Sequence, residues 1–552
     1  MADGEVSVLI GGRAGDGISS AGQVVAQLLG QHGYRIHMYL DYPSRIKGGH
    51  NFTVVRGAGE QVGAIREKVD FILALNQETV DLHRSKLGDS GVVVYDKGSV
   101  RNTDGIGVDI KEILNALDAP QVMGNSAIIG AFAKVAGMDW DTVERVFRKA
   151  IPRGVSRNLE VARLAYDSAE ERIRVARLDR PTLPVFTGNE AIGIGLIEGG
   201  LEAYFGYPMS PTSNILHFLV GQQEDARIRV FQPESEIAVV LMALGCAYAG
   251  TRAAVGTSGG GFCLMTEAIS LAGIAELPLP IILGQRSGPS TGLATYTAQG
   301  DLHFALNSGH GEFPRLVVAP GDAEEARSWT TVCMDLAWKY QVPAILLSDK
   351  IICEGMYSLD PWNAGDNRAE PILAEDEHPY LRYAFAESGI SPLLFPPAKG
   401  EVIRVNSHVH DTDGITTEDP DLTEGMAKKR WRKMALLKDE IEGMNPVHVL
   451  GDSDSSTALL CWGSGKWICH EIGKRLDLRV IQPVVLQPFP EVGFASAMDG
   501  VTRFYGVETN ETGQLCRLVK EFGYRPEDMV LKYDGRPFLV EELEARLREV
   551  VL

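Results

Sequence analysis

The chain has 552 residues, a formal net charge of -20, and ordinary shares of hydrophobic (45%) and charged (23%) residues. This length exceeds what one hydrophobic core supports and predicts about three domains of roughly 150 residues each. The acidity excludes nucleic acid as an expected partner, because the phosphates would be repelled.

The sequence shows neither a membrane-spanning segment nor a signal peptide. No continuous apolar run approaches the roughly 20 residues that a membrane span needs. The first residues, MADGEVSVLIGG, are acidic and lack the basic region that opens a signal peptide. We therefore expect no membrane partner and a cytoplasmic location.

Seven cysteines are scattered along the chain, and no two form a C-x-x-C pair. Such a set favours neither a disulfide framework nor a zinc site, and it lacks the closely spaced thiolates of an iron–sulfur cluster. We expect no metal site in this chain and mostly apolar core positions for the thiols. The seven are Cys246, Cys263, Cys333, Cys353, Cys461, Cys469 and Cys516.

Residues 1–178 have the pattern of one α/β domain. An apolar run at residues 6–10 leads into the glycine-rich turn GGRAGDG, and a helical pattern follows. The apolar stretches at residues 69–75 and 91–96 fit buried parallel strands. Residues 168–180 are strongly charged and precede RPTLP, which indicates a helix end and a linker.

Residues 184–355 predict a second α/β domain with a doubly wound parallel sheet. Helical patterns alternate with apolar strands such as AYFG, AAVGT, PLPIILG and AILLSD. Residues 356–445 are rich in proline, acidic residues and loop formers and end in a basic helical run, so we interpret them as a connector with a helix. A third α/β unit is expected over residues 446–552, with strands ALLCWG, RVIQPVVL and RFYGVE.

Four polar segments follow strands of the predicted second domain. Open α/β sheets bind ligands beyond the carboxyl ends of their strands, so four such segments on one sheet predict a ligand site. The segments are residues 207–213 (YPMSPTS), 232–237 (QPESEI), 256–262 (GTSGGGF) and 285–297 (QRSGPSTGLATYT).

Each segment offers a different contact. Hydroxyl and free backbone N–H groups of residues 207–213 suit an anionic ligand, and the glycines of residues 256–262 permit close approach of a ligand to the backbone. Glu236 lies in a helix that should be largely buried, where a charge needs a partner. Arg286 can fork onto a carboxylate with two hydrogen bonds.

Plain structural explanations compete with these interpretations. Residues 207–213 also fit an ordinary helix start capped by Thr212 or Ser213. Glu234 fits the common placement of a carboxylate at a helix N-terminus. A glycine-rich turn alone is a weak signal, and the segment around Arg286 also fits a surface loop.

Taken in order, the four segments resemble the alpha subunit of the 2-oxoacid:ferredoxin oxidoreductase family. The motifs are Y-P-M-S-P-T-S, Q-P-E-S-E-I, T-S-G-G-G-F and R-S-G-P-S-T-G-L-A-T, and the likeness extends over nearly the whole chain. Residues 1–178, with I-G-G-R-A-G-D-G and R-I-K-G-G-H, resemble the family's Rossmann-like gamma domain, fused ahead of alpha. Residues 184–355 resemble its pyrimidine-binding thiamine diphosphate domain, and residues 446–552 its transketolase C-terminal-like domain. The resemblance thus implies three α/β domains.

The resemblance also implies residue roles. Glu236 matches the carboxyl group that contacts N1′ of the aminopyrimidine ring of thiamine diphosphate. Arg286 matches the group that holds the substrate carboxylate, and Ser210 and Thr295 match positions that line the substrate. Ser210 stands where the family usually has threonine, and Gly260 where it usually has proline. The implied cofactor contacts are Tyr207, Pro208, Ser210, Glu236, Thr257, Ser258 and Gly259.

Two parts of the reaction centre are not found in this sequence. It has neither a G-D-G…N-N segment for Mg²⁺ and diphosphate nor a cysteine set for a cluster. In the family both lie in a beta subunit, so the resemblance implies a partner with Mg²⁺, the shared thiamine diphosphate and a [4Fe-4S] cluster. It further implies ferredoxin, coenzyme A and an (alpha-beta)2 assembly. Gly12, Arg13 and Gly15 would contact the phosphates of coenzyme A; plain turn packing is the alternative.

The implied reaction is thiamine diphosphate-dependent and coenzyme A-dependent oxidative decarboxylation of a 2-oxoacid with reduction of ferredoxin, in either direction. The fused gamma-alpha layout favours 2-oxoglutarate, converted to succinyl-CoA, while pyruvate, branched-chain or a broad range of 2-oxoacids are alternatives. An iron-free decarboxylase or transketolase-like enzyme is a second hypothesis. A dinucleotide-binding or regulatory scaffold is a third, which GGRAGDG does not favour because it is not G-x-G-x-x-G.

Overall fold

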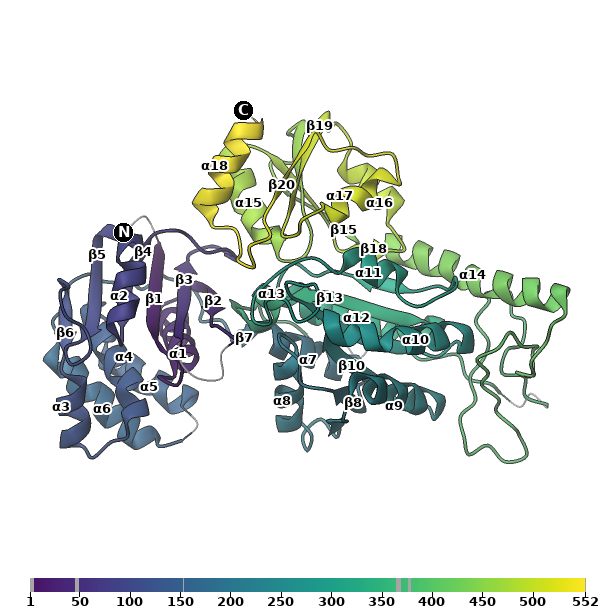
Figure 1. Ribbon diagram of the computed structural model, residues 1–552, viewed down its shortest axis with the longest axis horizontal. Helices are drawn as coiled ribbons and strands as arrows, with labels where there is room; N and C mark the ends of the chain where they lie inside the picture. Colours follow the sequence, from purple (N-terminus) through teal and green to yellow (C-terminus); the bar gives the residue numbers. More distant parts are fainter. Residues whose placement is uncertain (1–3, 45–48, 152, 364–368, 376–378, 552) are drawn as a thin grey trace. The chain divides into compact units, whose positions relative to one another are not determined.

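The computed structural model describes residues 4–44, 49–151, 153–363, 369–375 and 379–551 (Figure 1). Four residues of the R-I-K-G-G-H motif, 45–48, lie outside this described part. The chain divides into two compact units. The first comprises Met1–Thr187, Glu354–Pro361 and Phe538–Glu549, and the second comprises Gly188–Cys353, Trp362–Pro537 and Val550–Leu552. In the described ranges, no helix is long and apolar enough to cross a membrane.

An eight-stranded mixed sheet forms the first unit, in the order β6-β5-β4-β1-β3-β2-β14-β7. Strand β1 (Glu5–Arg13) pairs in parallel with β4 (Val69–Ala74), which pairs in parallel with β5 (Leu87–Asp96), so both predicted buried parallel strands are confirmed. The other elements are α1 (Ile18–Gln31), β2 (Arg35–Asp41), β3 (His50–Ala58), α2 (Gln77–His83), β6 (Ile106–Val108), α3 (Ile110–Ala116), α4 (Gly124–Val135), α5 (Trp140–Ala150), α6 (Val155–Ser168), β7 (Val185–Thr187), β14 (Met356–Ser358) and α18 (Val540–Val551).

Later segments of the chain complete this first unit. Strand β14 pairs antiparallel with both β2 and β7, so residues 185–187 and 356–358 extend the sheet beyond the predicted first domain. Leu539, directly before α18, forms a parallel bridge with Ile65. The unit therefore draws on three separate stretches of sequence.

The second unit contains a seven-stranded sheet in the order β18-β12-β13-β11-β10-β8-β9. Strands β8 to β13 are all parallel, and helices connect most of them, as the prediction of a doubly wound parallel sheet requires. The elements are α7 (Gly188–Glu198), β8 (Ala203–Gly206), α8 (Ser213–Gly221), β9 (Arg229–Phe231), α9 (Glu236–Tyr248), β10 (Ala253–Ser258), α10 (Gly259–Ala275), β11 (Leu279–Gln285), α11 (Leu302–Asn307), β12 (Leu316–Val318), α12 (Ala323–Tyr340), β13 (Pro343–Asp349) and α13 (Lys350–Glu354).

A five-stranded sheet, β15-β17-β16-β19-β20, follows in the same unit. The single strand predicted at RVIQPVVL is wrong in one detail, because it splits into β17 (Arg479–Pro483) and β18 (Val485–Gln487). Strand β18 crosses to the antiparallel edge of the seven-stranded sheet. Pro483 has no N–H group to continue a ladder, which favours a break there. The other elements are β15 (Val447–Gly451), β16 (Thr457–Leu460), α15 (Gly465–Leu476), α16 (Glu491–Ala497), β19 (Arg503–Glu508), α17 (Gln514–Lys520) and β20 (Asp528–Leu531).

One continuous hydrophobic core serves both sheets of the second unit. Val255 and Ile281 from the seven-stranded sheet belong to the same buried cluster as Ala458 and Ile481 from the five-stranded sheet. Burial of this shared apolar surface holds the two sheets together. The predicted second and third α/β regions therefore pack as one unit.

A buried charge cluster anchors the predicted connector. Helix α14 (Pro420–Glu442), capped by Asp419, places the Nζ atoms of Lys429 and Lys433 at 2.7 Å and 2.6 Å from the Glu276 carboxylate. All three side chains are at most 1% exposed. Burial would raise the pKa of Glu276, but the two ammonium groups outweigh burial and hold this pKa far below its usual value. Separating these charges would leave one of them buried and unpaired.

Candidate active site

The four polar segments lie at the carboxyl ends of four neighbouring parallel strands. Strands β11, β10, β8 and β9 are adjacent in that order in the second unit's sheet, and Figure 1 shows β8 and β10 beside α9. Arg286, Gly259, Tyr207 and Gln232 directly follow these strands. Tyr207 and Pro208 are exposed there. The shared strand direction therefore brings the four predicted segments to one edge of the sheet.

Glu236 is the first residue of α9 and is 4% exposed. Ser235 caps the helix, and its side chain accepts a hydrogen bond from the Ala238 N–H at 3.4 Å. A Cβ added to Gly261 would lie 2.6 Å from Glu236 Oε1 and 2.3 Å from Thr257 Oγ1. No described residue forms a hydrogen bond or ion pair with the Glu236 carboxylate. The buried Glu236 carboxylate therefore lies against Gly261 and is available to a ligand.

The end of β10 is polar and buried. Thr257 and Ser258 are 0% exposed, and α10 begins at Gly259 without a side-chain cap. The Ser258 hydroxyl is buried and has no hydrogen-bond partner among the described residues. The first N–H groups of a helix have no partner within the helix, so this end of α10 can hold an acceptor group.

Arg286 and Ser210, two of the predicted residues, are in contact. Arg286 Nη1 donates a hydrogen bond to the Ser210 carbonyl oxygen at 3.3 Å. Arg286 Nε is buried and finds no partner in the described part of the chain. Burial lowers the pKa of this guanidinium, and the nearby Asp301 partly offsets that effect. Arg286 therefore keeps hydrogen-bonding capacity for a ligand.

Asp301 is a site residue that sequence reasoning missed. Its backbone N–H donates a hydrogen bond to Gln285 Oε1 at 3.0 Å, and its Oδ2 atom would lie 2.7 Å from a Cβ on Gly259. Burial raises the pKa of Asp301 to about 6, although Arg286 acts to lower it. The only signal in the sequence is a lone aspartate directly before α11, which looks like an ordinary helix cap.

The loop of residues 286–301 is held from its far end by Gln299. The Gln299 Nε2 atom donates to the Trp462 carbonyl oxygen at 2.7 Å, and its Oε1 accepts from the Thr509 N–H at 3.0 Å. Thr295, the fourth predicted catalytic residue, is buried within this loop. The C-terminal part of the second unit therefore fixes the loop that carries the predicted substrate contacts.

One face of α9 and α10 is apolar and exposed. Ile237, Leu241 and Met242 of α9 are 50%, 44% and 48% exposed, and Leu264 of α10 is 50% exposed. Glu236 directly precedes Ile237, so the buried carboxylate and the start of this apolar face belong to the same turn of α9. A helix that is apolar all round is normally buried, and contiguous exposed apolar side chains mark a contact surface.

The GGRAGDG loop of the first unit is tightly packed and borders a small cavity. A Cβ on Gly12 would lie 2.9 Å from Asp16 Oδ2, and Gly15 has a φ of 102°. The Arg13 side chain is exposed, and the Arg13 backbone N–H donates a hydrogen bond to Asp16 Oδ2 at 2.7 Å. The cavity has a volume of about 90 Å³ and is lined by Arg13, Asp16, Leu75, Asp96, Ser99, Ile110, Gln121, Gly124 and Asn125. Gly12 is thus closely packed within the turn, and the same loop borders a polar cavity.

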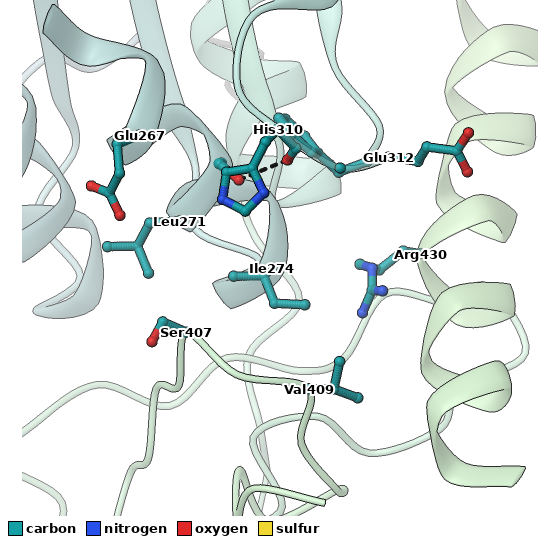
Figure 2. A pocket seen from close by; sticks show the side chains of 11 residues that line it. Glu267, Leu271, Ile274, His310, Glu312, Ser407, Val409 and Arg430 are labelled. Atoms are coloured by element: carbon teal, nitrogen blue, oxygen red, sulfur yellow. Dashed lines mark hydrogen bonds between the residues drawn. The ribbon is translucent and has the colours of Figure 1, made fainter. Parts of the chain in front are cut away.

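A larger cavity of about 270 Å³ lies elsewhere in the second unit (Figure 2). Figure 2 shows His310 above Leu271 and Ile274, with Arg430 at the side. The Ser270 hydroxyl donates to the His310 carbonyl oxygen at 2.8 Å. No predicted site residue lines this cavity, which is therefore separate from the candidate active site.

Over the described residues, no group of three or more His, Cys, Asp or Glu side chains is arranged to hold a metal ion. All seven cysteines are free thiols, and five of them are buried, as predicted for core positions.

Two protein-family models match the chain. The model described as "Pyruvate flavodoxin/ferredoxin oxidoreductase, thiamine diP-bdg" matches residues 194–427, which contain all four polar segments. The model described as "Pyruvate ferredoxin/flavodoxin oxidoreductase" matches residues 7–168, which contain the GGRAGDG loop.

A relative from Aeropyrum pernix, "2-oxoacid:ferredoxin oxidoreductase 2, subunit alpha", is 30% identical, and the match covers 99% of this chain and 98% of the relative. This chain belongs to the 2-oxoacid:ferredoxin oxidoreductase family. It is an alpha subunit of that oxidoreductase and contains a thiamine diphosphate-binding domain. The alpha subunit from Saccharolobus solfataricus is 29% identical, with 99% and 98% of the two chains covered.

The fold of this alpha subunit is also similar to a solved structure. The 2-oxoglutarate:ferredoxin oxidoreductase from Magnetococcus marinus, with 2-oxoglutarate, coenzyme A and succinyl-CoA bound, matches over 100% of both chains with a TM-score of 0.89 and 25% identity. The "2-oxoglutarate oxidoreductase subunit KorA" from Mycobacterium tuberculosis is 30% identical over 66% of this chain and 56% of its own length. The expected family and fold class are thus confirmed.

Proposed function

We propose that this alpha subunit joins a beta subunit to catalyse the coenzyme A-dependent oxidative decarboxylation of a 2-oxoacid, with electron transfer to ferredoxin. The observation that carries the proposal is Glu236, a buried carboxylate without a partner among the described residues, at the start of the helix that carries an exposed apolar face. An unpaired buried charge is costly. A cofactor that brings a hydrogen-bond donor to this carboxylate would remove the cost.

The residues around Glu236 fit the aminopyrimidine of thiamine diphosphate. Glu236 would hold a proton on the N1′ atom of the ring, and Gly261, which has no side chain, leaves room for the Glu236 carboxylate in this position. Thr257 and Ser258 add buried hydroxyl groups at the end of β10. When bound, the cofactor supplies a carbon nucleophile and accepts the electrons released by decarboxylation. This chain orients the ring and controls its protonation.

Arg286 is our candidate for the substrate carboxylate. Its guanidinium is already oriented by the Ser210 carbonyl oxygen, while its buried Nε lacks a partner among the described residues. A carboxylate can accept two hydrogen bonds from one guanidinium. Ser210 and Thr295 would line the substrate beside it, because one contacts Arg286 and the other is buried in the same loop.

The exposed apolar face of α9 and α10 is our candidate surface for the beta subunit. Covering Ile237, Leu241 and Leu264 would remove apolar surface from water and also close the space beside Glu236. The beta subunit would carry the diphosphate-binding residues, Mg²⁺ and a [4Fe-4S] cluster, in an (alpha-beta)2 assembly.

The GGRAGDG loop is our candidate contact for coenzyme A. The exposed Arg13 guanidinium and the N-terminus of α1 can receive phosphate groups. The Asp16 and Asp96 carboxylates that line the adjacent cavity can accept hydrogen bonds from ribose hydroxyls. Plain turn packing explains Gly12 equally well, so Arg13 is the residue that distinguishes the two interpretations.

2-Oxoglutarate is the 2-oxoacid that the relatives favour. The Magnetococcus marinus enzyme holds 2-oxoglutarate, and the Mycobacterium tuberculosis relative is a 2-oxoglutarate oxidoreductase subunit. We propose the conversion of 2-oxoglutarate to succinyl-CoA for this chain as well, in either direction. Pyruvate or branched-chain substrates are the alternatives.

The test is a 2-oxoacid panel on the chain co-expressed with its beta subunit, with coenzyme A and ferredoxin or a viologen as acceptor. We expect a brown complex whose acceptor reduction needs both coenzyme A and a 2-oxoacid and is fastest with 2-oxoglutarate. The chain alone should be colourless and inactive. Aldehyde or ketol products formed without coenzyme A would instead support an iron-free thiamine diphosphate enzyme.

A further inference from the structure

Two half-buried charged side chains lie at the two ends of the loop of residues 286–301. The Arg286 Nε atom and the Asp301 Oδ2 atom are both buried, and neither has a hydrogen-bond partner among the described residues. The two groups interact electrostatically, because each shifts the acidity of the other. Within the described residues, they form no direct ion pair. Asp301 therefore acts on the charge of Arg286 without a direct contact between the two charged groups.

The backbone holds both groups in position. Gln285, the last residue of β11, accepts the Asp301 N–H at 3.0 Å and directly precedes Arg286, so it joins the two ends of the loop. The Ser210 carbonyl oxygen holds Arg286 Nη1 at 3.3 Å. Gly259 lies against the Asp301 carboxylate, where a Cβ would come within 2.7 Å of Oδ2. Neither charge can move far from the other.

Substrate binding would change the charge balance at this place. Without substrate, Asp301 compensates the charge of Arg286. A substrate carboxylate on Arg286 brings a second negative charge to the same cation. Two carboxylates that share one buried site do not readily both stay ionised, because their repulsion favours the protonated form of one of them.

Resting on the proposed role of Arg286, we infer that Asp301 is the counter-ion of Arg286 in the free enzyme and takes up a proton from water when a 2-oxoacid carboxylate binds. The substrate carboxylate then replaces the Asp301 carboxylate as the counter-charge of the guanidinium, and the net charge of the site is unchanged. The bond formed is the O–H bond of the Asp301 carboxyl group. Asp301 is thus a positioning residue for the substrate contact and has no contact of its own with the reacting atoms.

The acidity of Asp301 suits this exchange. Burial raises its pKa to about 6, and Arg286 is the group that lowers it. Among the described residues, the Cys263 thiol of α10 is also affected by the Asp301 charge, which helps to raise the pKa of the thiol. When a substrate occupies Arg286, the lowering effect weakens and the Asp301 pKa rises. The affinity for the substrate carboxylate should therefore fall as the pH rises above about 6, by up to about tenfold per pH unit within the window between the two pKa values.

The experiment is calorimetric titration of the co-purified complex with oxamate, an unreactive 2-oxoacid analogue, in two buffers of different ionisation enthalpy between pH 6 and pH 8. The wild-type complex should take up a fraction of one proton per site and bind oxamate more weakly at high pH. Asp301→Asn, which imitates the protonated group, should bind without proton uptake and with an affinity that no longer depends on pH. Glu267→Gln, an exposed charge change on the same helix that Asp301 faces, should behave as wild type.

Three outcomes separate the inference from the proposed function. Absence of proton uptake in the wild-type complex overturns the inference without any variant that must fold. Equal uptake in Asp301→Asn also overturns it, because another group then titrates. Arg286→Gln should lose at least tenfold in oxamate affinity; unchanged binding there would remove the proposed role of Arg286 itself, independently of Asp301.

Discussion

Gly261 lies so close to Glu236 that an added Cβ would come within 2.6 Å of the carboxylate oxygen Oε1. The same Cβ would lie 2.3 Å from Thr257 Oγ1. Because Gly261 has no side chain, the Glu236 carboxylate can occupy this space. The neighbouring Gly260 has nothing within 4 Å of its Cβ position. Two adjacent glycines of one helix therefore differ sharply in what they allow.

Gly261→Ala should damage the cofactor site although alanine is the better helix former by about 1 kcal/mol. The added methyl group must displace Glu236 or Thr257, so we expect thiamine diphosphate to bind at least tenfold more weakly to the assembled complex. Titration of cofactor-depleted complex with thiamine diphosphate measures this. Gly260→Ala is the matched control and should change the affinity little; equal losses in both variants would contradict the account.

Arg286→Lys should raise KM for the 2-oxoacid by about tenfold to a hundredfold, because lysine keeps the charge but cannot fork onto a carboxylate. Steady-state kinetics of the complex over a range of 2-oxoacid concentrations provide the measurement. Arg229→Lys, an exposed change at the start of β9, serves as the control. An unchanged KM in Arg286→Lys would argue for a different carboxylate contact.

Leu241→Arg should prevent assembly with the beta subunit. The side chain is 44% exposed in this chain, so arginine is tolerated in the free subunit, but burial of its charge in an apolar interface is costly. We expect the beta subunit no longer to co-purify. Val492→Arg is the control, because Val492 of α16 is 71% exposed and lies outside the apolar face. Normal assembly of Leu241→Arg would place the beta subunit elsewhere.

Glu276→Gln should destabilise the second unit by about 3–5 kcal/mol, because Lys429 and Lys433 would remain buried without a counter-charge. The folded-state pKa of Glu276 is depressed, so its contribution is present above the unfolded pKa and is lost as the pH falls through the folded pKa. Chemical denaturation at neutral and acidic pH measures both effects. Glu424→Gln, in the exposed pair with Lys428, should have no measurable effect.

Much of the active-site edge follows from the sequence because its strands are unambiguous. Strands β8, β10 and β11 are apolar runs that end in polar or glycine-rich turns, and strands of one parallel sheet must end at a common edge. Strands β7 and β14 have three residues each, too few for a recognisable period, so their pairing in the first unit's sheet could not be predicted.

Asp301 shows the other limit of sequence reasoning. An aspartate before a helix predicts a cap, but α11 has no side-chain cap hydrogen bond, and the carboxylate lies against Gly259 instead. Such a contact joins positions more than 40 residues apart and depends on the packing of the loop. The residue contacts proposed for the cofactor, and the cytoplasmic location, stay predictions.

The central claim is that Glu236 serves thiamine diphosphate, and Glu236→Gln tests it most directly. The complex containing this variant should assemble normally, because the carboxylate has no partner among the described residues. Its rate of ferredoxin reduction with 2-oxoglutarate and coenzyme A should fall by at least a hundredfold. Glu234→Gln, two residues earlier and exposed, should keep the wild-type rate. A near-normal rate in the Glu236→Gln complex would contradict the account.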